Sequence, residues 1–189
     1  MPGITLMHAD GRLKKPSCTA KAGQGFTLIE LMVTLVVLGI IAAIATPAFT
    51  GLVNANRLTS QSNELIGAIQ MARSEAIKRN ERVSFCGSTD GAACVAGSAT
   101  WTQWLVLRDA GGVVLQAGQI RAPLQVNSAN PQMTFQADGL ARTAAGLLFT
   151  GDITVCLPVS RPVENLRRIA VAGGSRTSVS SVANAGACP

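Results

Sequence analysis

Histidine, tyrosine and charged residues are scarce in this sequence. Its 189 residues include no tyrosine and one histidine, His8, and charged residues make up only 14% of the chain. Without a histidine beyond position 8, the rest of the chain cannot build a Ser-His-Asp or a Cys-His catalytic arrangement. No glycine-rich phosphate loop follows an expected strand, and the acidic residues are scattered singly. We therefore expect neither an enzyme nor a bound cofactor.

Charge is also nearly absent from one long apolar run, which reads FTLIELMVTLVVLGIIAAIATPAF over residues 26–49. Its length suits one membrane-spanning helix, which needs about 20 apolar residues. Residues 1–25 carry four basic side chains and one acidic side chain, a net charge of +3. By the positive-inside rule this basic flank lies in the cytoplasm, so that the polar remainder of the chain emerges across the membrane.

Glu30 is the residue that a plain membrane anchor does not explain, because an unpaired carboxylate in the hydrocarbon region costs about 3 kcal/mol. Three kinds of segment compete for this apolar run: a secretory signal, a plain anchor, and a helix that is exposed by a cut before the run. No small-residue cleavage site with polar sequence follows promptly, which disfavours the secretory signal. A cut before Phe26 would create an amine about one helical turn from Glu30, and a paired charge costs far less than a lone one.

The stretch GQGFTLIELMVTLVVLGIIAAIATP resembles the N-terminus of type IV pilins and type II secretion pseudopilins. The resemblance implies that residues 1–25 are a cytoplasmic leader. It also implies that prepilin peptidase cuts between Gly25 and Phe26, and that the new N-terminal residue Phe26 is methylated.

The same resemblance implies a role in assembly for Glu30, which becomes the fifth residue after the cut. When helices pack side by side in a filament, the Glu30 carboxylate can meet the Phe26 amine of a neighbouring subunit. It would then set the register of assembly, as a single polar core residue does in a coiled coil. Gly39 and Pro47 are the positions where we expect the helix to kink or to unwind locally.

The helix is predicted to continue beyond the membrane segment, because apolar residues recur with a period of about 3.6. We divide it into a membrane and assembly helix over residues 26–49 and a periplasmic half over residues 50–81. The apolar stripe of the second half is expected to pack against a sheet. Its members are Leu58, Leu65, Ile69, Ala72 and Ala76, with Ile66 and Ile77 beside them.

Residues 82–189 change to a period of two and predict a β-rich globular domain. Trp101 and Trp104 are expected on opposite faces of one strand, and turns are expected at residues 138–139 and 151–152. A helix followed by strands indicates an α+β domain. The expected strands are 82–86, 101–109, 113–119, 124–128, 133–139, 146–150, 153–158, 166–173 and 177–182.

Four of the five cysteines lie in this domain, and Cys18 lies in the leader. Outside the cytoplasm four cysteines can pair in three ways, and four buried thiols are the alternative. We prefer the pairs Cys86–Cys94 and Cys156–Cys188, because each would tie a loop or the tail to a neighbouring strand. A zinc site is disfavoured, since the cysteines lack CxxC spacing and no histidine accompanies them.

The globular part resembles the GspH/FimT family of minor pilins and pseudopilins in the stretches SEAIKRN, WLVLRDAGG, MTFQADG and CLP…RRIAVAGGSR. The resemblance implies a long helix packed on two small antiparallel sheets. It implies a subunit held in the bacterial inner membrane with its domain in the periplasm. Such a subunit assembles with other pilins, near the tip, into a type IV pilus or a type II secretion pseudopilus. The paired cysteines and the basic ending favour the pilus, and both machines stay open.

DNA binding is the second function class. Some FimT proteins are implied to take up DNA through a C-terminal Gly-Arg-x-Arg motif. In the matching stretch GGSRTS, Arg176 fits the first arginine, but Ser178 stands where the second is expected. Arg167, Arg168 and Arg176 could contact phosphates. Ordinary solvated arginines on an outer strand remain the favoured interpretation.

Overall fold

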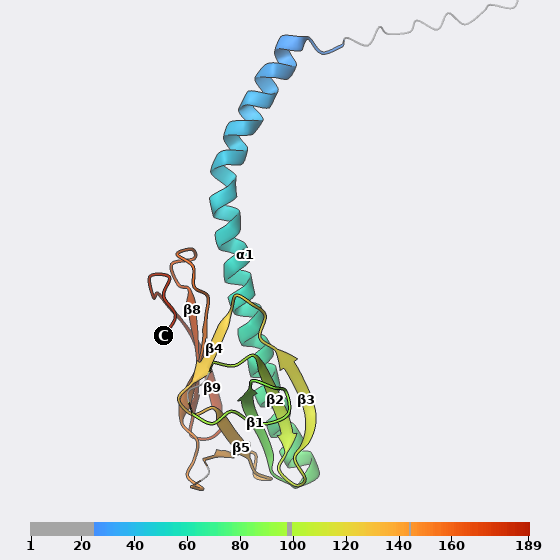
Figure 1. The fold of residues 1–189 in the computed structure, drawn as a ribbon, viewed down its shortest axis with the longest axis vertical. Coiled ribbons are helices and arrows are strands. Elements are labelled where there is room, and N and C mark those ends of the chain that lie inside the picture. Colours follow the sequence, from blue (N-terminus) through green and yellow to red (C-terminus); the bar gives the residue numbers. More distant parts are fainter. Residues whose placement is uncertain (1–24, 98–99, 144) are drawn as a thin grey trace, which may run out of the picture. The chain divides into compact units, whose positions relative to one another are not determined.

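The computed structural model describes residues 25–97, 100–143 and 145–189, so that Cys18 and the basic leader lie outside the described residues. One helix, α1 (Leu28–Arg79), is followed in the described chain by nine strands, which confirms the α+β prediction (Figure 1). The chain divides into two compact units between Ile41 and Ala42. The second unit contains the rest of α1 and every strand.

α1 is one helix of 52 residues whose second half carries the core stripe. Leu58, Leu65, Ile69, Ala72 and Ala76 are all buried, as the apolar period predicted. Ile66 lies at the edge of the core and Ile77 is exposed. The helix continues through positions 39 and 47 without a break, so it does not unwind locally there, and the kink stays a prediction.

The strands form two antiparallel sheets, as the family resemblance implied. The first sheet has the order β3-β2-β1-β5-β6, and the second has the order β4-β7-β8-β9. A bridge between Trp101 and Val126 joins the two sheets. The strands are β1 (Val83–Ser88), β2 (Gln103–Arg108), β3 (Val113–Gln119), β4 (Gln125–Ser128), β5 (Gln132–Phe135), β6 (Ala141–Arg142), β7 (Gly151–Cys156), β8 (Leu166–Ala172) and β9 (Arg176–Val182).

The two tryptophans do not lie on opposite faces of a strand, so that prediction is wrong. β2 begins at Gln103, so that Trp101 lies outside the strand. Its side chain therefore does not follow the alternation of strand side chains between the two faces of the sheet. Both indoles are buried, and their ring centroids lie 6.0 and 6.4 Å from the ring of Phe85. Trp101 lies directly over Gly87, where a Cβ atom would come within 2.1 Å of the indole.

Two further local predictions are wrong. Residues 146–150 form no strand, because only Leu148 bridges to Arg142. Residues 151–152 form the start of β7 and not a turn, because β8 supplies their hydrogen-bonding partners. The turn at residues 138–139 is confirmed, and Gly139 has φ +75° there. The strand expected over 133–139 is correspondingly shorter and ends at Phe135.

Candidate assembly site and neighbouring surfaces

The first turn of α1 is capped by Thr27, which precedes the helix. The backbone N–H of Glu30 donates to Thr27 Oγ1 at 3.3 Å, and the N–H of Leu31 donates to the Thr27 carbonyl at 3.2 Å. This is the N-cap half of a capping box, in which a threonine is followed three residues later by glutamate. The Glu30 carboxylate also lies in the first turn, where negative charge is favoured by the helix dipole. Thr27 is not among the residues predicted from the sequence, although the T-x-x-E pattern signals such a cap.

The N-terminal half of α1 has no protein cover in the described chain. Gly25, Phe26 and Glu30 are exposed, and Phe26 is 80% accessible. Every residue from 28 to 45 is exposed as well. An 18-residue window of α1 has a mean hydropathy of 2.7, so the helix is long and apolar enough to cross a membrane. An exposed apolar surface of this extent requires lipid or other apolar helices around it.

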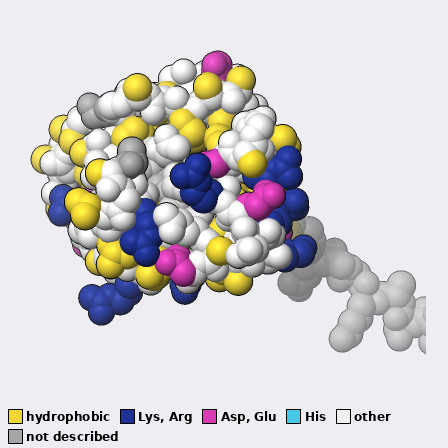
Figure 2. All heavy atoms as spheres, turned by 90° about the horizontal axis from the view of Figure 1, so that it is seen from below, with side chains coloured by type: hydrophobic (Ala, Val, Ile, Leu, Met, Phe, Trp, Pro, Cys, Tyr) yellow, Lys and Arg dark blue, Asp and Glu magenta, His cyan; other side chains and the backbone are white. Residues whose placement is uncertain are grey.

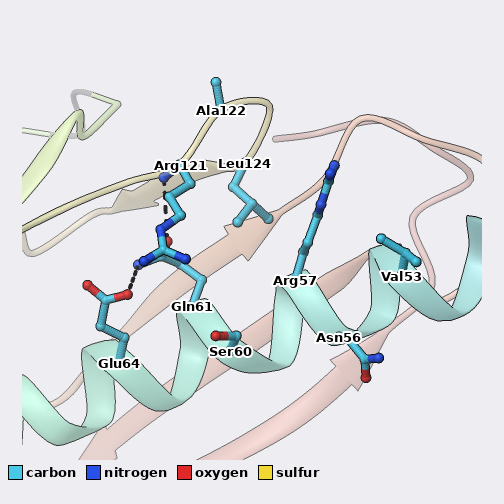
Figure 3. A pocket seen from close by; sticks show the side chains of 9 residues that line it. All are labelled: Val53, Asn56, Arg57, Ser60, Gln61, Glu64, Arg121, Ala122 and Leu124. Atoms are coloured by element: carbon cyan, nitrogen blue, oxygen red, sulfur yellow. Dashed lines mark hydrogen bonds between the residues drawn. The ribbon is translucent and has the colours of Figure 1, made fainter.

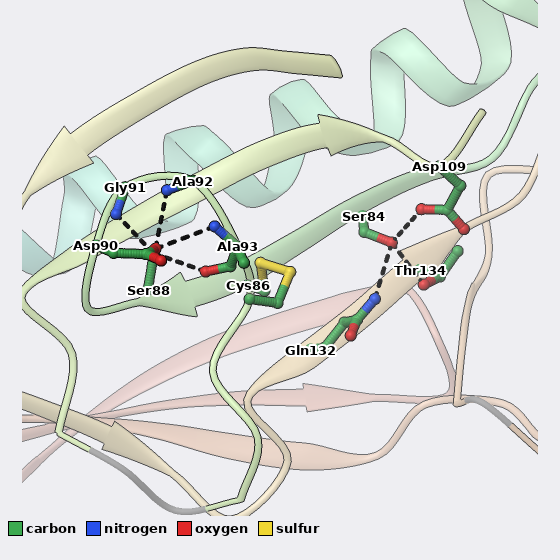
Figure 4. Close-up of a disulfide and its surroundings, with 11 residues drawn as sticks. Ser84, Cys86, Ser88, Asp90, Gly91, Ala92, Ala93, Asp109, Gln132 and Thr134 are labelled. Atoms are coloured by element: carbon green, nitrogen blue, oxygen red, sulfur yellow. Dashed lines mark hydrogen bonds between the residues drawn. A yellow bond between two sulfur atoms is a disulfide. The ribbon is translucent and has the colours of Figure 1, made fainter. Parts of the chain in front are cut away.

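The first disulfide closes the loop after β1. Cys86 is bonded to Cys94, one of the two pairs that the sequence analysis preferred. The loop is also held by hydrogen bonds around Asp90 (Figure 4). The backbone N–H groups of Ala92 and Ala93, with the Ser88 hydroxyl, hold the pKa of the Asp90 carboxyl below its usual range.

The second disulfide, Cys156–Cys188, ties the C-terminal tail to the end of β7. Asn165 is fully buried beside it and binds both segments. Its Nδ2 donates to the carbonyls of Leu157 at 2.9 Å and Ala187 at 3.1 Å, and its Oδ1 accepts from the N–H of Asn184 at 3.0 Å. The tail and the segment between β7 and β8 therefore form one braced unit. This use of Asn165 has no signal in the sequence.

A groove lies between α1 and the segment that joins β3 to β4 (Figure 3). Glu64 accepts a hydrogen bond from Trp104 Nε1 at 3.0 Å, and Gln61 receives the backbone N–H of Arg121 at 3.5 Å. Arg57 extends from the helix towards the opposite wall. Ser60 and Glu64 line the groove without a hydrogen bond between them, and no group of three potential metal ligands occurs among the described residues.

The three arginines considered for DNA do not form one cluster. Arg168 pairs with Ser180 across β8 and β9, and Arg176 is four residues from Ser180, so both arginines lie on the same face of the sheet. Arg167 lies on the other face, where its Nη1 donates to the carbonyls of Glu164 and Leu166. Arg168 also lies 3.9 Å from the Asp152 carboxylate. On the domain face in Figure 2, basic and acidic side chains are interspersed.

Comparisons with known proteins match both the apolar N-terminal segment and the globular domain. The family described as "Type II transport protein GspH" matches residues 61–178, and the prokaryotic N-terminal methylation motif matches residues 21–46. A Moraxella bovis protein described as "Type IV major alpha-pilin" is 48% identical over 44 residues, which are 23% of this chain and 28% of that protein. A Pseudomonas aeruginosa "Fimbrial protein" is 36% identical over 63 residues, 33% of this chain and 40% of that protein. The chain thus spans well under half the length of these relatives.

A solved structure shares the fold. It is the type IV minor pilin FimU of Pseudomonas aeruginosa, with a TM-score of 0.50 and 20% identity. The match covers 67% of this chain and 90% of the solved chain.

Proposed function

Because the chain belongs to the GspH family of minor pilins and pseudopilins, we propose that it is an inner-membrane subunit that assembles with other pilins into a filament. In this proposal prepilin peptidase cuts between Gly25 and Phe26, and the new N-terminus is methylated. The apolar half of α1 then holds the subunit in the membrane, with its domain in the periplasm. The observation that carries the proposal is the exposed apolar helix surface within a matched methylation motif.

The first turn of α1 supplies the chemistry of assembly in this proposal. After the cut, the amine of Phe26 lies just before the N-cap Thr27, and the Glu30 carboxylate lies in the first turn of α1. In lipid each charge alone is costly, and a pair costs far less. A neighbouring subunit can supply the partner charge for either group. We therefore propose that Glu30 fixes the register of an arriving subunit against its neighbour.

Processing is tested by the mass of the protein from a host that has prepilin peptidase. The expected chain begins at methylated Phe26 and lacks residues 1–25. Gly25→Val should keep the leader, because a branched side chain replaces hydrogen at the cut. Gly23→Ala, in the same stretch, is the matched control and should be processed normally. A mature chain that begins elsewhere, or normal cleavage of Gly25→Val, would refute the proposed site.

The position of the subunit within the filament is a further part of the proposal. We place the subunit near the tip, where it primes assembly; the match of its domain to the GspH family supports this placement. Such a subunit should be present at a small fraction of the major subunit. Immunogold labelling should then find it at filament ends. Labelling along the whole shaft would contradict the tip position.

DNA binding is a second candidate, favoured by the shared exposed face of Arg168 and Arg176. Phosphate contacts of this kind weaken with salt. Detergent-solubilised protein should then shift DNA in a gel at low salt, and Arg168→Glu with Arg176→Glu should abolish the shift. Arg167→Glu is the control and should have little effect, because Arg167 lies on the other face. Absence of any salt-sensitive shift, or an unchanged shift for the double variant, would reject this candidate.

A further inference from the structure

We propose that the segment between β7 and β8, residues 157–165, contacts the lipid headgroups of the membrane in which α1 is anchored. We call it the β7–β8 loop. Its apolar contact would be Val163, and Arg161 together with Arg57 of α1 would bind the phosphates of anionic lipids. This inference rests on the proposed membrane anchoring and adds a second membrane contact, made by the globular domain.

The β7–β8 loop is fixed beside the part of α1 that follows the apolar run. Asn54 Nδ2 donates to the Arg161 carbonyl at 3.0 Å, and the Cβ atom of Arg161 lies 4.0 Å from the Cβ position at Gly51. Figure 1 shows the β7–β8 loop beyond the ends of the strands, beside α1. The loop therefore stands at a defined height along the helix.

That height corresponds to the headgroup layer. The apolar run ends at Phe49, so that Gly51 and Asn54 lie roughly 3 and 8 Å further along the helix at 1.5 Å per residue. A headgroup layer occupies about 5–8 Å on each side of the hydrocarbon core. Arg57 lies about 12 Å beyond Phe49, and arginines on a helix lean towards its N-terminus. Its guanidinium can therefore reach back to the same layer.

The side chains at this height suit a lipid surface. Val163 is 70% exposed, although the loop that carries it is braced at its base. The N–H of Leu157 donates to the Asn165 carbonyl at 2.9 Å, and a Cβ atom at Gly186 of the tail would come within 3.3 Å of the Val159 backbone. A braced loop that exposes a valine between Arg161 and Glu164 fits contact with a membrane interface, where an apolar body has polar neighbours.

Five carboxylates of the described domain already have basic partners. In the described domain the acidic side chains Glu75, Glu81, Asp109, Asp138 and Asp152 each lie within 4 Å of a basic side chain.

Arg57 and Arg161 are exposed and have no carboxylate partner among the described residues, and they share this lack of a partner with Arg73, Arg121, Arg167 and Arg176. Arg161 and Arg57 differ from the others in their place beside and just beyond the end of the apolar run. Together with Glu164 on the β7–β8 loop, Arg57 and Arg161 keep a net positive charge. Lipid phosphates are the anions that an anchored helix places at this height.

The test measures contact with lipid tails by fluorescence in vesicles that contain the full-length protein. Val163→Trp adds an indole at the loop, and lipids with brominated chains quench indoles that reach them. Trp101 and Trp104 are buried and give a constant background. Val113→Trp is the matched control, because Val113 is also exposed but lies at the start of β3, paired with Arg108 of β2. Arg108 lies 3.7 Å from Glu81, just after the C-terminal end of α1. The indole at 163 should be quenched and the indole at 113 should not.

The headgroup part is tested by lipid composition. Quenching of the indole at 163 should be stronger in phosphatidylcholine mixed with phosphatidylglycerol than in phosphatidylcholine alone. Arg161→Gln or Arg57→Gln should each lower the odds of contact about fivefold in the anionic vesicles, which corresponds to about 1 kcal/mol per basic residue. Arg176→Gln, an exposed arginine on β9, should leave the contact unchanged.

Leu38→Trp separates this inference from the proposed anchoring. Leu38 lies in the apolar run, so its indole should be quenched whenever the helix is inserted. If it is quenched while the indoles at 163 and 113 behave alike, anchoring stands and the loop contact is refuted. If it is not quenched, the anchoring fails and the loop contact fails with it. If the glutamine variants change nothing, the phosphate contacts of Arg57 and Arg161 are refuted.

Discussion

The two halves of α1 have the same secondary structure but opposite surroundings. Between residues 28 and 45 every side chain is exposed, whereas in the second half Leu58, Leu65 and Ile69 are each at most 1% accessible. The first half is apolar on all sides, and the second half is apolar along one stripe. The stripe is explained by the protein's own sheets. In the described chain the first half has no protein cover, and in the proposed function its partners are lipid and other subunits.

This difference separates residues that determine the fold from residues that determine assembly. A substitution in the stripe should destabilise the domain, because it leaves a cavity in a shared core. A substitution in the first half should leave the domain intact and change only membrane or subunit contacts.

The largest effect that distinguishes the two halves is expected from a matched pair of leucine substitutions. Leu65→Ala should lower the free energy of unfolding of the domain by about 2–5 kcal/mol, as for other fully buried leucines. Leu35→Ala, in the exposed half, should leave it unchanged. Urea unfolding of the detergent-solubilised protein, followed by tryptophan fluorescence, measures both. Equal losses from the two variants would remove the distinction.

A second effect of similar size concerns the disulfides, both of which lie in the domain. The Cys156–Cys188 bridge closes a longer segment than Cys86–Cys94, with sequence separations of 32 and 8. By loop-closure entropy, replacing the pairs with alanine should cost about 3.7 and 2.6 kcal/mol respectively. Neither change should affect membrane insertion of the apolar half. Loss of insertion in either double variant would show that the two regions depend on each other.

The smallest effect is the response of the Asp90 loop to acid. The pKa of Asp90 is lowered in the folded chain, so its ionised form stabilises the loop above the unfolded pKa of about 3.9. That contribution is lost as pH falls through the folded pKa. Carboxyl NMR should find Asp90 titrating below an ordinary aspartate, and Asp90→Asn should remove this part of the pH dependence. Titration at the ordinary value would contradict the loop geometry.

The sequence predicted the helix, the stripe and the resemblance to pilins because each is a local, periodic or contiguous pattern. Residues Leu58 to Ala76 repeat at helical spacing, and the GFTLIE motif is continuous. The N-cap at Thr27 was also visible in principle, since its T-x-x-E pattern is local.

Features that depend on long-range contacts could not be predicted in this way. Trp101 was assigned to a strand by its neighbours, but it packs over Gly87 and bridges to Val126 of the second sheet. Residues 151–152 look like a turn, yet β8 pairs with them. Asn165 shows no special pattern, although it holds the tail through two hydrogen bonds and Leu157 through a third. Tertiary packing decides each of these positions.

The incorporation of Glu30→Ala into filaments tests the proposed assembly role most directly. We expect a processed, membrane-held protein with a normally folded domain that is lost from purified filaments, because the neighbouring Phe26 amine has no carboxylate partner. Glu164→Ala, an exposed glutamate of the domain, is the control and should be incorporated normally. Quantitative immunoblots of sheared filaments and of membranes measure both. Incorporation of Glu30→Ala at the wild-type level would contradict the proposed role of Glu30.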